Sequence, residues 1–213
     1  MLSLLFPPKC TLCKKILDKN ETDLCHDCRK NAPEFKKAKR NIPFIAHWTA
    51  LWYYKDDVRG SIHRFKFSNR RGYSAVYARL LALHLQSADP DTYDLLTWVP
   101  VSGLRRFKRG YDQSALLATD LGSELNLPVV HTLRKIRHTP PQSMIRDAAK
   151  RRANVLGAYK TVSDQQILGK RIILVDDVVT TGATASECAR VLLSAGAKEV
   201  FFAAVAAAEY DKK

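Results

Sequence analysis

The stretch Arg171–Thr184, which reads RIILVDDVVTTGAT, constrains the fold more than any other part of the chain. Its apolar run, Ile172–Val175, has the length of one buried strand, and a turn followed by an apolar pattern at helical spacing comes next. A buried strand that leads into a helix predicts a parallel α/β sheet with both faces covered. Asp176 and Asp177 would then lie at the carboxyl edge of that sheet, where open α/β folds bind their ligands.

The residues that follow the acid pair have the character of an anion site. They are Thr180, Thr181, Gly182, Ala183 and Thr184. The start of a helix offers free backbone N–H groups and a positive dipole end to phosphate, and a glycine there lets the backbone approach a ligand closely. Carboxylates repel phosphate but accept hydrogen bonds from hydroxyl groups. The pattern therefore fits a ribose 5-phosphate, with its hydroxyls on the acids and its phosphate on the loop.

This run resembles the signature of the phosphoribosyltransferases, which bind phosphoribosyl pyrophosphate (PRPP). The resemblance implies that Asp176 and Asp177 contact the ribose hydroxyls and that residues 180–184 hold the 5-phosphate. The alternative is a structural role, because acid pairs also end strands in receiver domains and Thr-Gly turns also cap helices that bind nothing. Neither Gly-x4-Gly-Lys nor Gly-x-Gly-x-x-Gly occurs, so a nucleotide triphosphatase or a Rossmann site is unsupported.

Four cysteines near the N-terminus have the spacing of a metal site. They form two Cys-x2-Cys pairs separated by eleven residues: Cys10, Cys13, Cys25 and Cys28. Four thiolates suit one structural Zn2+, which would supply the folding energy of a segment too polar for its own core. Disulfides are the alternative, but Met1–Phe6 is unlike a signal peptide, so we expect a reducing, cytoplasmic compartment. His26 could replace one thiolate, and Cys188 is expected in the core.

The rest of the chain predicts one further domain. Residues 1–40 are expected to form the zinc-binding module and residues 41–213 a phosphoribosyltransferase-like domain, with no membrane insertion because no apolar run approaches 18 residues. Periodicity predicts strands at 47–54, 95–99, 129–132, 171–175 and 200–205, and helices at 58–67, 73–85, 111–125, 142–155 and 183–195. This alternation predicts a mostly parallel sheet flanked by helices.

The positive charge is distributed unevenly along the chain. Residues 1–152 hold 28 Lys and Arg against 14 Asp and Glu, whereas residues 153–213 hold seven of each. The excess gathers in clusters at 36–40, 59–71, 105–109 and 134–152. Aromatic side chains are interleaved with these clusters: Phe65, Phe67, Tyr73 and Phe107. Basic clusters with stacking aromatics predict binding to single-stranded nucleic acid, and a solvated basic face is the alternative.

A cationic loop is expected at Pro100–Gly110, after the strand at 95–99. Its positive side chains are Arg105, Arg106, Lys108 and Arg109. In a phosphoribosyltransferase-like site this loop, with Arg105, Arg109 and Gly110, would meet the pyrophosphate. Arg109 is the expected functional cation, because a planar guanidinium can hold two phosphate oxygens at once.

The cysteine pairs, the segment Arg109-Gly-Tyr-Asp-Gln113 and the acid-pair loop together resemble the ComF family of bacterial competence proteins, including its GntX-like members. Further matches follow in the same order along the chain: Phe65-Lys66-Phe67, Thr139, Gln142, Arg151, Asn154, Gly157 and Tyr159. The family usually has Pro-Val-Pro and Arg-Gly-Phe-Asn-Gln, where this chain has Ser102, Tyr111 and Asp112. An added acid at Asp112, beside a pyrophosphate, would weaken the case for turnover.

The resemblance implies a PRPP-binding protein that handles single-stranded DNA during natural transformation, alongside a competence helicase. The alternative is an active phosphoribosyltransferase of nucleotide salvage, which releases pyrophosphate. In that enzyme Asp176, Asp177 and Arg109 would be the catalytic residues: the acids would orient the ribose and the arginine would add positive charge. Mg2+ bound to the oxygens of PRPP would neutralise the leaving group.

Overall fold

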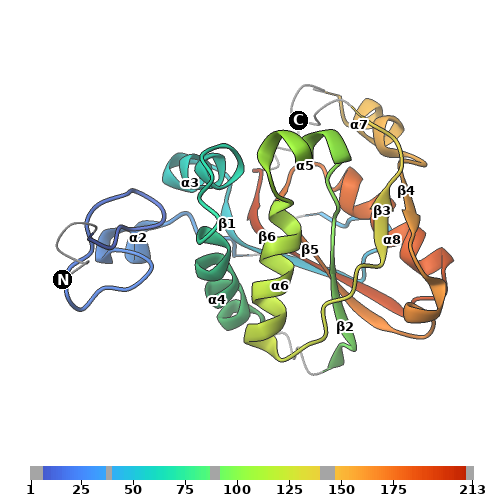
Figure 1. The fold of residues 1–213 in the computed structure, drawn as a ribbon, viewed down its shortest axis with the longest axis horizontal. Helices are drawn as coiled ribbons and strands as arrows, with labels where there is room; N and C mark the ends of the chain where they lie inside the picture. The colour runs from blue at the N-terminus through green and yellow to red at the C-terminus, as the bar shows by residue number, and fades with distance from the viewer. Residues whose placement is uncertain (1–6, 37–39, 87–91, 140–146, 210–213) are drawn as a thin grey trace.

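Four parallel strands form the main sheet of the protein (Figure 1). The computed structural model describes residues 7–36, 40–86, 92–139 and 147–209. The sheet order is β1 (His47–Tyr53), β6 (Glu199–Ala207), β5 (Arg171–Val179) and β2 (Leu95–Trp98). The predicted parallel α/β sheet is therefore confirmed. No described helix has the length and apolar character needed to cross a membrane.

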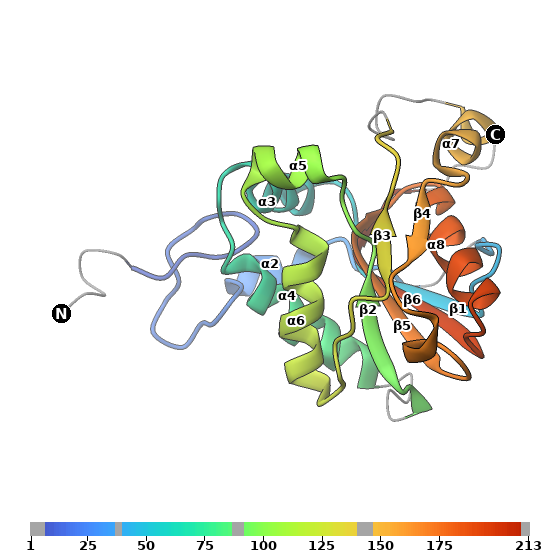
Figure 2. The ribbon, with the colours of Figure 1, turned by 45° about the vertical axis from the view of Figure 1, so that its right-hand side comes forward.

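Helices cover both faces of this sheet. On one face lie α3 (Asp56–Phe67), α4 (Tyr73–Leu85) and α6 (Gln113–Leu125), and on the other lies α8 (Ala183–Ser194) (Figures 1 and 2). Successive strand residues point to opposite faces, so Ile173 and Val175 join the core under α4 and α6 while Ile172 and Leu174 join the core under α8. This explains why the strand reads as a continuous apolar run.

The carboxyl edge of the sheet differs from the sequence prediction in two places. Strand β5 continues past Val175 through the acid pair to Val179, because it stays paired with the alanine-rich end of β6. The expected loop at 100–110 contains a helix, α5 (Gly103–Arg109), which ends at Gly110 in a left-handed conformation. None of the residues of α5 is buried, so the helix has no apolar periodicity by which the sequence could have shown it.

A second, two-stranded sheet lies beside α8. It pairs β3 (Leu133–Lys135) with β4 (Tyr159–Thr161) in antiparallel register, and α7 (Ala148–Val155) and a short 3-10 helix, η4 (Asp164–Gln166), adjoin it in sequence. The predicted strand at 129–132 is wrong, since only Val129 forms a bridge there, with Leu96. Helix α7 begins at Ala148, and residues 142–146 of the helix predicted at 142–155 lie outside the described residues. Gln142 and Met1–Phe6, which carried two of the predictions, lie outside the described residues.

The N-terminal segment, which includes a short helix, α2 (His26–Asn31), packs against α3 and α4 through its loops (Figure 1). Leu12 and Leu24 belong to the same hydrophobic core as Ile62 and Leu81, so the core continues across the two segments. Further along, the backbone of Phe35 donates to the carbonyl of Leu51 at 2.9 Å, which fastens the connecting chain to the edge of β1. The domain division after residue 40 stays a prediction.

Candidate functional site

The acid pair of β5 is held by two helices that lie on the same face of the sheet, α3 and α6. The Asp176 carboxylate accepts a hydrogen bond from the Ser114 hydroxyl of α6 at 2.8 Å and from the backbone N–H of Asp177 at 2.8 Å. Asp177 is buried, and its carboxylate pairs with the Lys66 ammonium of α3 at 2.8 Å. Ser114 and Lys66 were not among the predicted site residues. The only sequence signal for Lys66 was its place in the Phe65–Phe67 match.

Two carboxylates in such a small space make ionisation of one of them unfavourable. Burial, and next the Asp177 carboxylate, raise the pKa of Asp176 from 3.8 to about 7, while Lys66 and Ser114 act in the opposite direction. A group whose pKa is higher in the folded than in the unfolded chain stabilises the fold below the unfolded pKa, and loses that effect as the pH rises through the folded pKa. Stability from Asp176 is therefore lost between about pH 4 and pH 7.

We expect Asp176→Asn to unfold at a higher temperature than the unsubstituted protein at pH 8, with the difference disappearing near pH 4. The amide oxygen can still accept from the Ser114 hydroxyl, but it carries no charge. Thermal unfolding followed by circular dichroism between pH 4 and pH 9 measures this. Asp177→Asn is the matched comparison, and it should be destabilising at pH 8 because Lys66 loses its partner. An equal effect of Asp176→Asn at every pH would contradict the prediction.

The predicted phosphate loop lies directly before α8, as expected. Helix α8 begins at Ala183, and Thr180, Thr181 and Thr184 are partly exposed, so their hydroxyl groups are accessible beside the free N–H groups of the helix start. The Thr181 hydroxyl also accepts from the N–H of Ala183 at 3.4 Å. These residues can together surround an anion at the start of a helix of twelve residues.

Gly182 has a structural reason beside the predicted one. Its φ is +79°, and a Cβ atom there would lie 2.8 Å from Cδ1 and Cγ1 of Ile42. The backbone of Gly182 therefore approaches closely the chain that connects the N-terminal segment to β1. The guanidinium of Arg40, in the same connecting chain, donates to the carbonyl oxygen of Thr180. One side of the phosphate loop is thus covered by Arg40 and Ile42.

Of the predicted pyrophosphate residues, Arg105 and Arg109 lie on α5 and Gly110 directly follows it. The two arginines contact different partners. Arg109 donates to the Gln113 side-chain oxygen at 2.7 Å, and its guanidinium carbon lies 4.8 Å from the centre of the Phe67 ring. Arg105 donates to the carbonyl of Thr139 at 2.9 Å. Burial, and then the nearby Arg109, lower the pKa of Arg105. Arg109 is thus joined to the acid pair through the first turn of α6, where Ser114 follows Gln113.

Asp112 does not oppose a pyrophosphate as a free acid. Its carboxylate caps α6 by accepting from the N–H groups of Ser114 at 3.1 Å and Ala115 at 3.2 Å, and it also accepts from Val101 at 3.1 Å. Burial raises the pKa of Asp112, while these main-chain donors act in the opposite direction. The carboxylate therefore joins the loop after β2 to α6, and the expectation that it weakens the case for turnover loses its basis.

Two buried polar groups near α5 have no hydrogen-bond partner among the described residues: the hydroxyl of Ser102 and the side-chain nitrogen of Gln113. Such groups are rare in folded proteins, and each needs an explanation. Ser102 is also a position where this chain departs from the family pattern. Both groups can donate to the oxygens of a ligand at this edge, and sequence reasoning did not select either of them.

Lys135, in the second sheet, also interacts electrostatically with Asp176. Burial, followed by the nearby Arg105, lowers the pKa of Lys135 to about 8, whereas the Asp176 carboxylate acts in the opposite direction. Its ammonium nitrogen lies 5.1 Å from the centre of the Tyr159 ring. The sequence missed Lys135 because the predicted strand ended at residue 132. Cys188 is fully buried in the core, as predicted, and burial raises the pKa of its thiol.

The four N-terminal cysteines meet the requirements of a zinc site. Their sulfur atoms all lie within 4.8 Å of one another, and all five cysteines of the chain are free thiols, so the disulfide alternative is wrong. His26 is outside this group, and its side chain is 80% exposed beside Asp27, so it does not replace a thiolate. Four sulfur donors at this separation suit one tetrahedral zinc ion.

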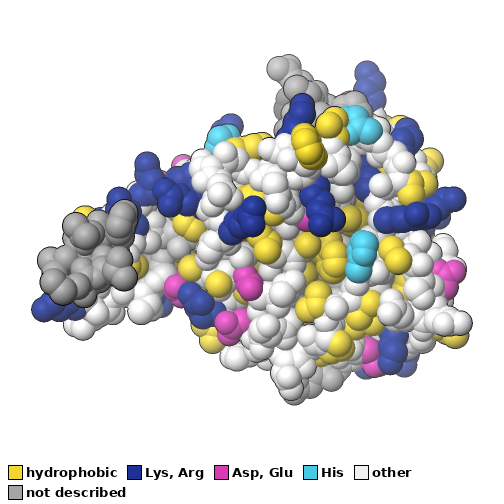
Figure 3. Space-filling model, viewed as in Figure 1, with side chains coloured by type: hydrophobic (Ala, Val, Ile, Leu, Met, Phe, Trp, Pro, Cys, Tyr) yellow, Lys and Arg dark blue, Asp and Glu magenta, His cyan; other side chains and the backbone are white. Residues whose placement is uncertain are grey.

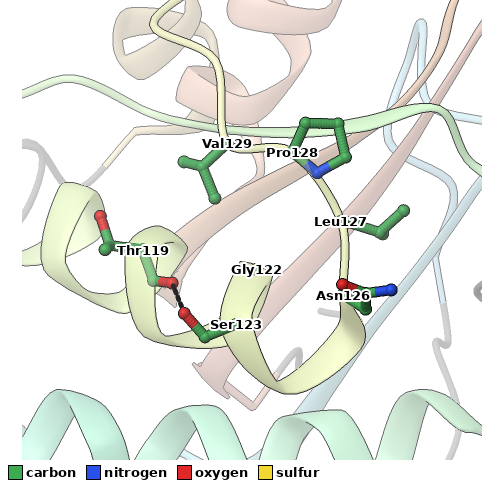
Figure 4. A pocket seen from close by; sticks show the side chains of 7 residues that line it. All are labelled: Thr119, Gly122, Ser123, Asn126, Leu127, Pro128 and Val129. Atoms are coloured by element: carbon green, nitrogen blue, oxygen red, sulfur yellow. Dashed lines mark hydrogen bonds between the residues drawn. The ribbon is translucent and has the colours of Figure 1, made fainter.

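The structure also has a hollow that is distinct from the acid pair (Figure 4). It lies at the C-terminal end of α6, whereas the acid pair lies at the start of that helix. Its lining residues are Thr119, Gly122, Ser123, Asn126, Leu127, Pro128 and Val129. None of them has an ionisable side chain, in contrast to the residues around the acid pair.

Comparisons with known proteins agree with both parts of this description. A family model described as a double zinc ribbon domain matches residues 1–39, and one described as a phosphoribosyl transferase domain matches residues 112–213. The first match and the cysteine geometry make the N-terminal segment a zinc ribbon and support a structural zinc ion, which Cys10, Cys13, Cys25 and Cys28 could hold. The second covers α6, the two-stranded sheet, α7, β5, α8 and β6, and describes them as a phosphoribosyl transferase domain.

Several known proteins are similar to this chain in sequence or structure. Over 183 residues it is 32% identical to competence protein F of Haemophilus influenzae, covering 83% of this chain and 75% of that protein. Over 144 residues it is 34% identical to DNA utilization protein YhgH of Escherichia coli O157:H7, covering 65% of this chain and 62% of that protein. A solved glutamine PRPP amidotransferase from B. subtilis has a TM-score of 0.47 at 22% identity, covering 67% of this chain and 30% of that one, a likeness that carries no functional argument.

Proposed function

The chain belongs to the competence protein F family, and from that premise we propose that it binds PRPP or a related phosphoribosyl ligand and handles single-stranded DNA during natural transformation. The premise rests on a relative with 32% identity across three quarters of that relative's length. The name of competence protein F, and the name DNA utilization protein of the YhgH relative, both support a role with DNA. A competence helicase is the protein partner that we propose for this role.

The ligand proposal is carried by one observation: the acid pair and the start of α8 lie on the same sheet edge. A ribose hydroxyl pair can donate to Asp176 and Asp177, which Ser114 and Lys66 hold in place. The 5-phosphate fits the hydroxyl and main-chain donors of residues 180–184. Ser114 and Lys66 therefore act as positioning residues in this proposal.

A pyrophosphate would extend from the ribose toward the first turns of α5 and α6. There the unpartnered donors of Ser102 and Gln113 and the guanidinium groups of Arg105 and Arg109 can bind its oxygens. Mg2+ would enter with the ligand, bound mainly to the ligand's own oxygens. We place the protein in the cytoplasm, because a buried free thiol and four cysteines arranged for zinc suit a reducing compartment.

The salvage enzyme is the less favoured candidate. The curated relatives named above are described as competence and DNA utilization proteins, and neither name refers to nucleotide salvage. The residues of the site would suit a displacement of pyrophosphate from the sugar, but a ligand can occupy the same residues without reacting. Base-dependent release of pyrophosphate is the measurement that would establish the enzyme.

Calorimetric titration of PRPP and Mg2+ into the zinc-loaded protein tests the ligand, with pyrophosphate release measured in parallel. We expect binding without release, and we expect Asp177→Asn to lose PRPP affinity. Asp164→Asn is a charge-matched control, because Asp164 is exposed on η4. No binding of PRPP to the unsubstituted protein would contradict the ligand proposal.

Fluorescence anisotropy with a labelled oligonucleotide tests DNA handling. We expect single-strand affinity that falls steeply with salt, with a slope of about −0.7 in log K against log salt for each phosphate contacted. Asp177→Asn should retain this affinity, because its partner Lys66 lies inside the site. Negligible binding at low salt would contradict the DNA proposal without affecting the ligand proposal.

A further inference from the structure

We propose that Phe67 and Phe107 form a stacking surface for the bases of single-stranded DNA, and that the Lys and Arg side chains around them hold its phosphates. This inference rests on the proposed function and assigns the DNA to one place on the molecule. We call this place the α3–α5 surface, and it consists of Phe67, Arg70, Arg71, Arg106, Phe107 and Lys108. The end of α3 and the turn after it lie beside α5 in both ribbon views (Figures 1 and 2).

The two rings differ from the other aromatic residues of the basic clusters by their exposure. Phe107 is 86% exposed and Phe67 is 59% exposed. Phe65 is fully buried in the core, and the partly buried Tyr73 contacts Arg64 through its hydroxyl. Of the four aromatics that the sequence suggested for stacking, Phe107 presents an open ring to a base, and the partly exposed Phe67 ring lies beside the His63 ring at 4.7 Å and the Arg109 guanidinium at 4.8 Å. Base stacking on an exposed ring is tolerant of sequence, which suits a protein that handles incoming strands.

The charge of this surface fits a polyanion. Residues 58–72 and 99–111 contain nine Lys and Arg and no Asp or Glu. Lys66 is paired with Asp177 inside the site, but Arg70, Arg71, Arg106 and Lys108 are exposed. Over α5, hydrophobic side chains lie among those of Lys and Arg on the face shown in Figure 3. A protein partner with an apolar patch would not require this charge, whereas phosphates do.

Arg109 connects this surface to the ligand site. Its guanidinium lies 4.8 Å from the centre of the Phe67 ring and donates to Gln113 at 2.7 Å, next to the Ser114 that holds Asp176. A strand stacked on Phe67 would therefore pass beside the opening where the pyrophosphate of the ligand is proposed to lie. The DNA strand and the phosphoribosyl ligand, which are both anionic, would then lie on either side of Arg109.

The test compares ionic and stacking contributions by anisotropy with a labelled oligothymidine at several salt concentrations. Phe107→Ala should weaken single-strand binding about 5- to 100-fold without changing the salt slope, because a stacked ring releases no counterions. Phe107→Trp should retain the affinity. Arg106→Gln with Lys108→Gln should instead reduce the slope, by about 0.7 for each lost phosphate contact. Leu83→Ala, at a 63% exposed apolar residue on α4, is the control and should change neither value.

The outcomes separate this inference from the proposed function. If Phe107→Ala and Phe67→Ala both bind the strand within twofold of the unsubstituted protein, the stacking surface is wrong even though DNA handling stands. The inference also fails if Phe107→Ala loses affinity for a protein partner and retains it for the strand. PRPP titration into Phe107→Ala should give an unchanged affinity, which shows that the fold and the ligand site are intact.

Discussion

Removal of zinc is expected to unfold residues 7–36 and also to weaken the phosphoribosyl site. Structural zinc ions contribute about 10–16 kcal/mol of apparent folding free energy in small zinc modules. The four sulfur atoms here lie within 4.8 Å of one another, and without a metal they would repel as thiolates or remain as weakly bonded thiols. The segment has few apolar residues of its own, so without zinc only its contacts with α3 and α4 oppose its unfolding.

The loss of zinc should affect the phosphoribosyl site through helix α3, which contacts the N-terminal segment. The Ser61 hydroxyl donates to the carbonyl of Thr11 at 2.6 Å, and Arg64 donates to the carbonyls of Thr11 and Leu12, which lie between the first two zinc ligands. Lys66, two residues beyond Arg64, holds Asp177. Loss of the zinc knuckle would leave the polar groups of α3 unpaired and allow Lys66 to move. We expect PRPP affinity to fall at least about tenfold, which corresponds to ~1.4 kcal/mol.

Chelation, with zinc release followed by a colorimetric indicator, can be combined with circular dichroism and PRPP titration. Cys25→Ser should reproduce the result of chelation. Cys188→Ala should keep its zinc, because Cys188 lies in the other core and outside the metal group. If the main unfolding transition and the PRPP affinity were unchanged after zinc loss, the module would be independent of the site. In that case the contacts of Ser61 and Arg64 with Thr11 and Leu12 would not couple zinc binding to PRPP affinity.

Gly182→Ala is the substitution from which we expect the largest single-residue effect on the phosphate loop. An alanine at a φ of +79° costs about 1–2 kcal/mol, and a methyl group 2.8 Å from Ile42 adds about 1–3 kcal/mol of overpacking. The loop cannot move away freely, because Arg40 also binds the carbonyl of Thr180. We therefore expect a loss of about 2–5 kcal/mol of stability together with loss of PRPP binding.

Urea unfolding of a small set of variants separates the cost of the backbone conformation from the cost of overpacking against Ile42. Gly169→Ala has nearly the same backbone conformation, with a φ of +73° and open space around its Cβ position, so it should show the backbone cost alone. Ile42→Ala removes the atoms that the new methyl group would meet. The double variant Gly182→Ala/Ile42→Ala should then be less destabilised than the sum of the two single variants. Simple additivity would contradict the assigned contact between the connecting chain and the loop.

Sequence analysis correctly predicted those features whose residues lie close together in the chain. Two Cys-x2-Cys pairs indicate a metal site by their spacing, and the geometry of the four sulfur atoms agrees. The run from Arg171 to Thr184 places a buried strand, two acids and a helix start in one continuous segment. Helix α4 was predicted to the residue, because the apolar pattern of residues 73–85 lies on a helix that covers the sheet.

Other features depended on contacts that leave no local pattern. Helix α5 buries none of its residues, so it has no periodic apolar face. The pairing of β3 with β4 joins three residues on each side and depends on partners some 25 positions apart in the chain. The same holds for exposure: Phe65 and Phe67 are two positions apart, yet the core packing of α3 buries the first and leaves the second open.

The sequence by itself determined the spacing of the four cysteines, the buried strand that leads into the acid pair and the helix that follows it, because each follows from residues close together in the chain. Only the tertiary structure decided what surrounds them. Lys66 on Asp177, Ile42 on Gly182 and Arg109 on Phe67 each join residues distant in sequence. Such contacts form only when separate elements pack on one sheet, and packing is set by the whole fold rather than by any one segment.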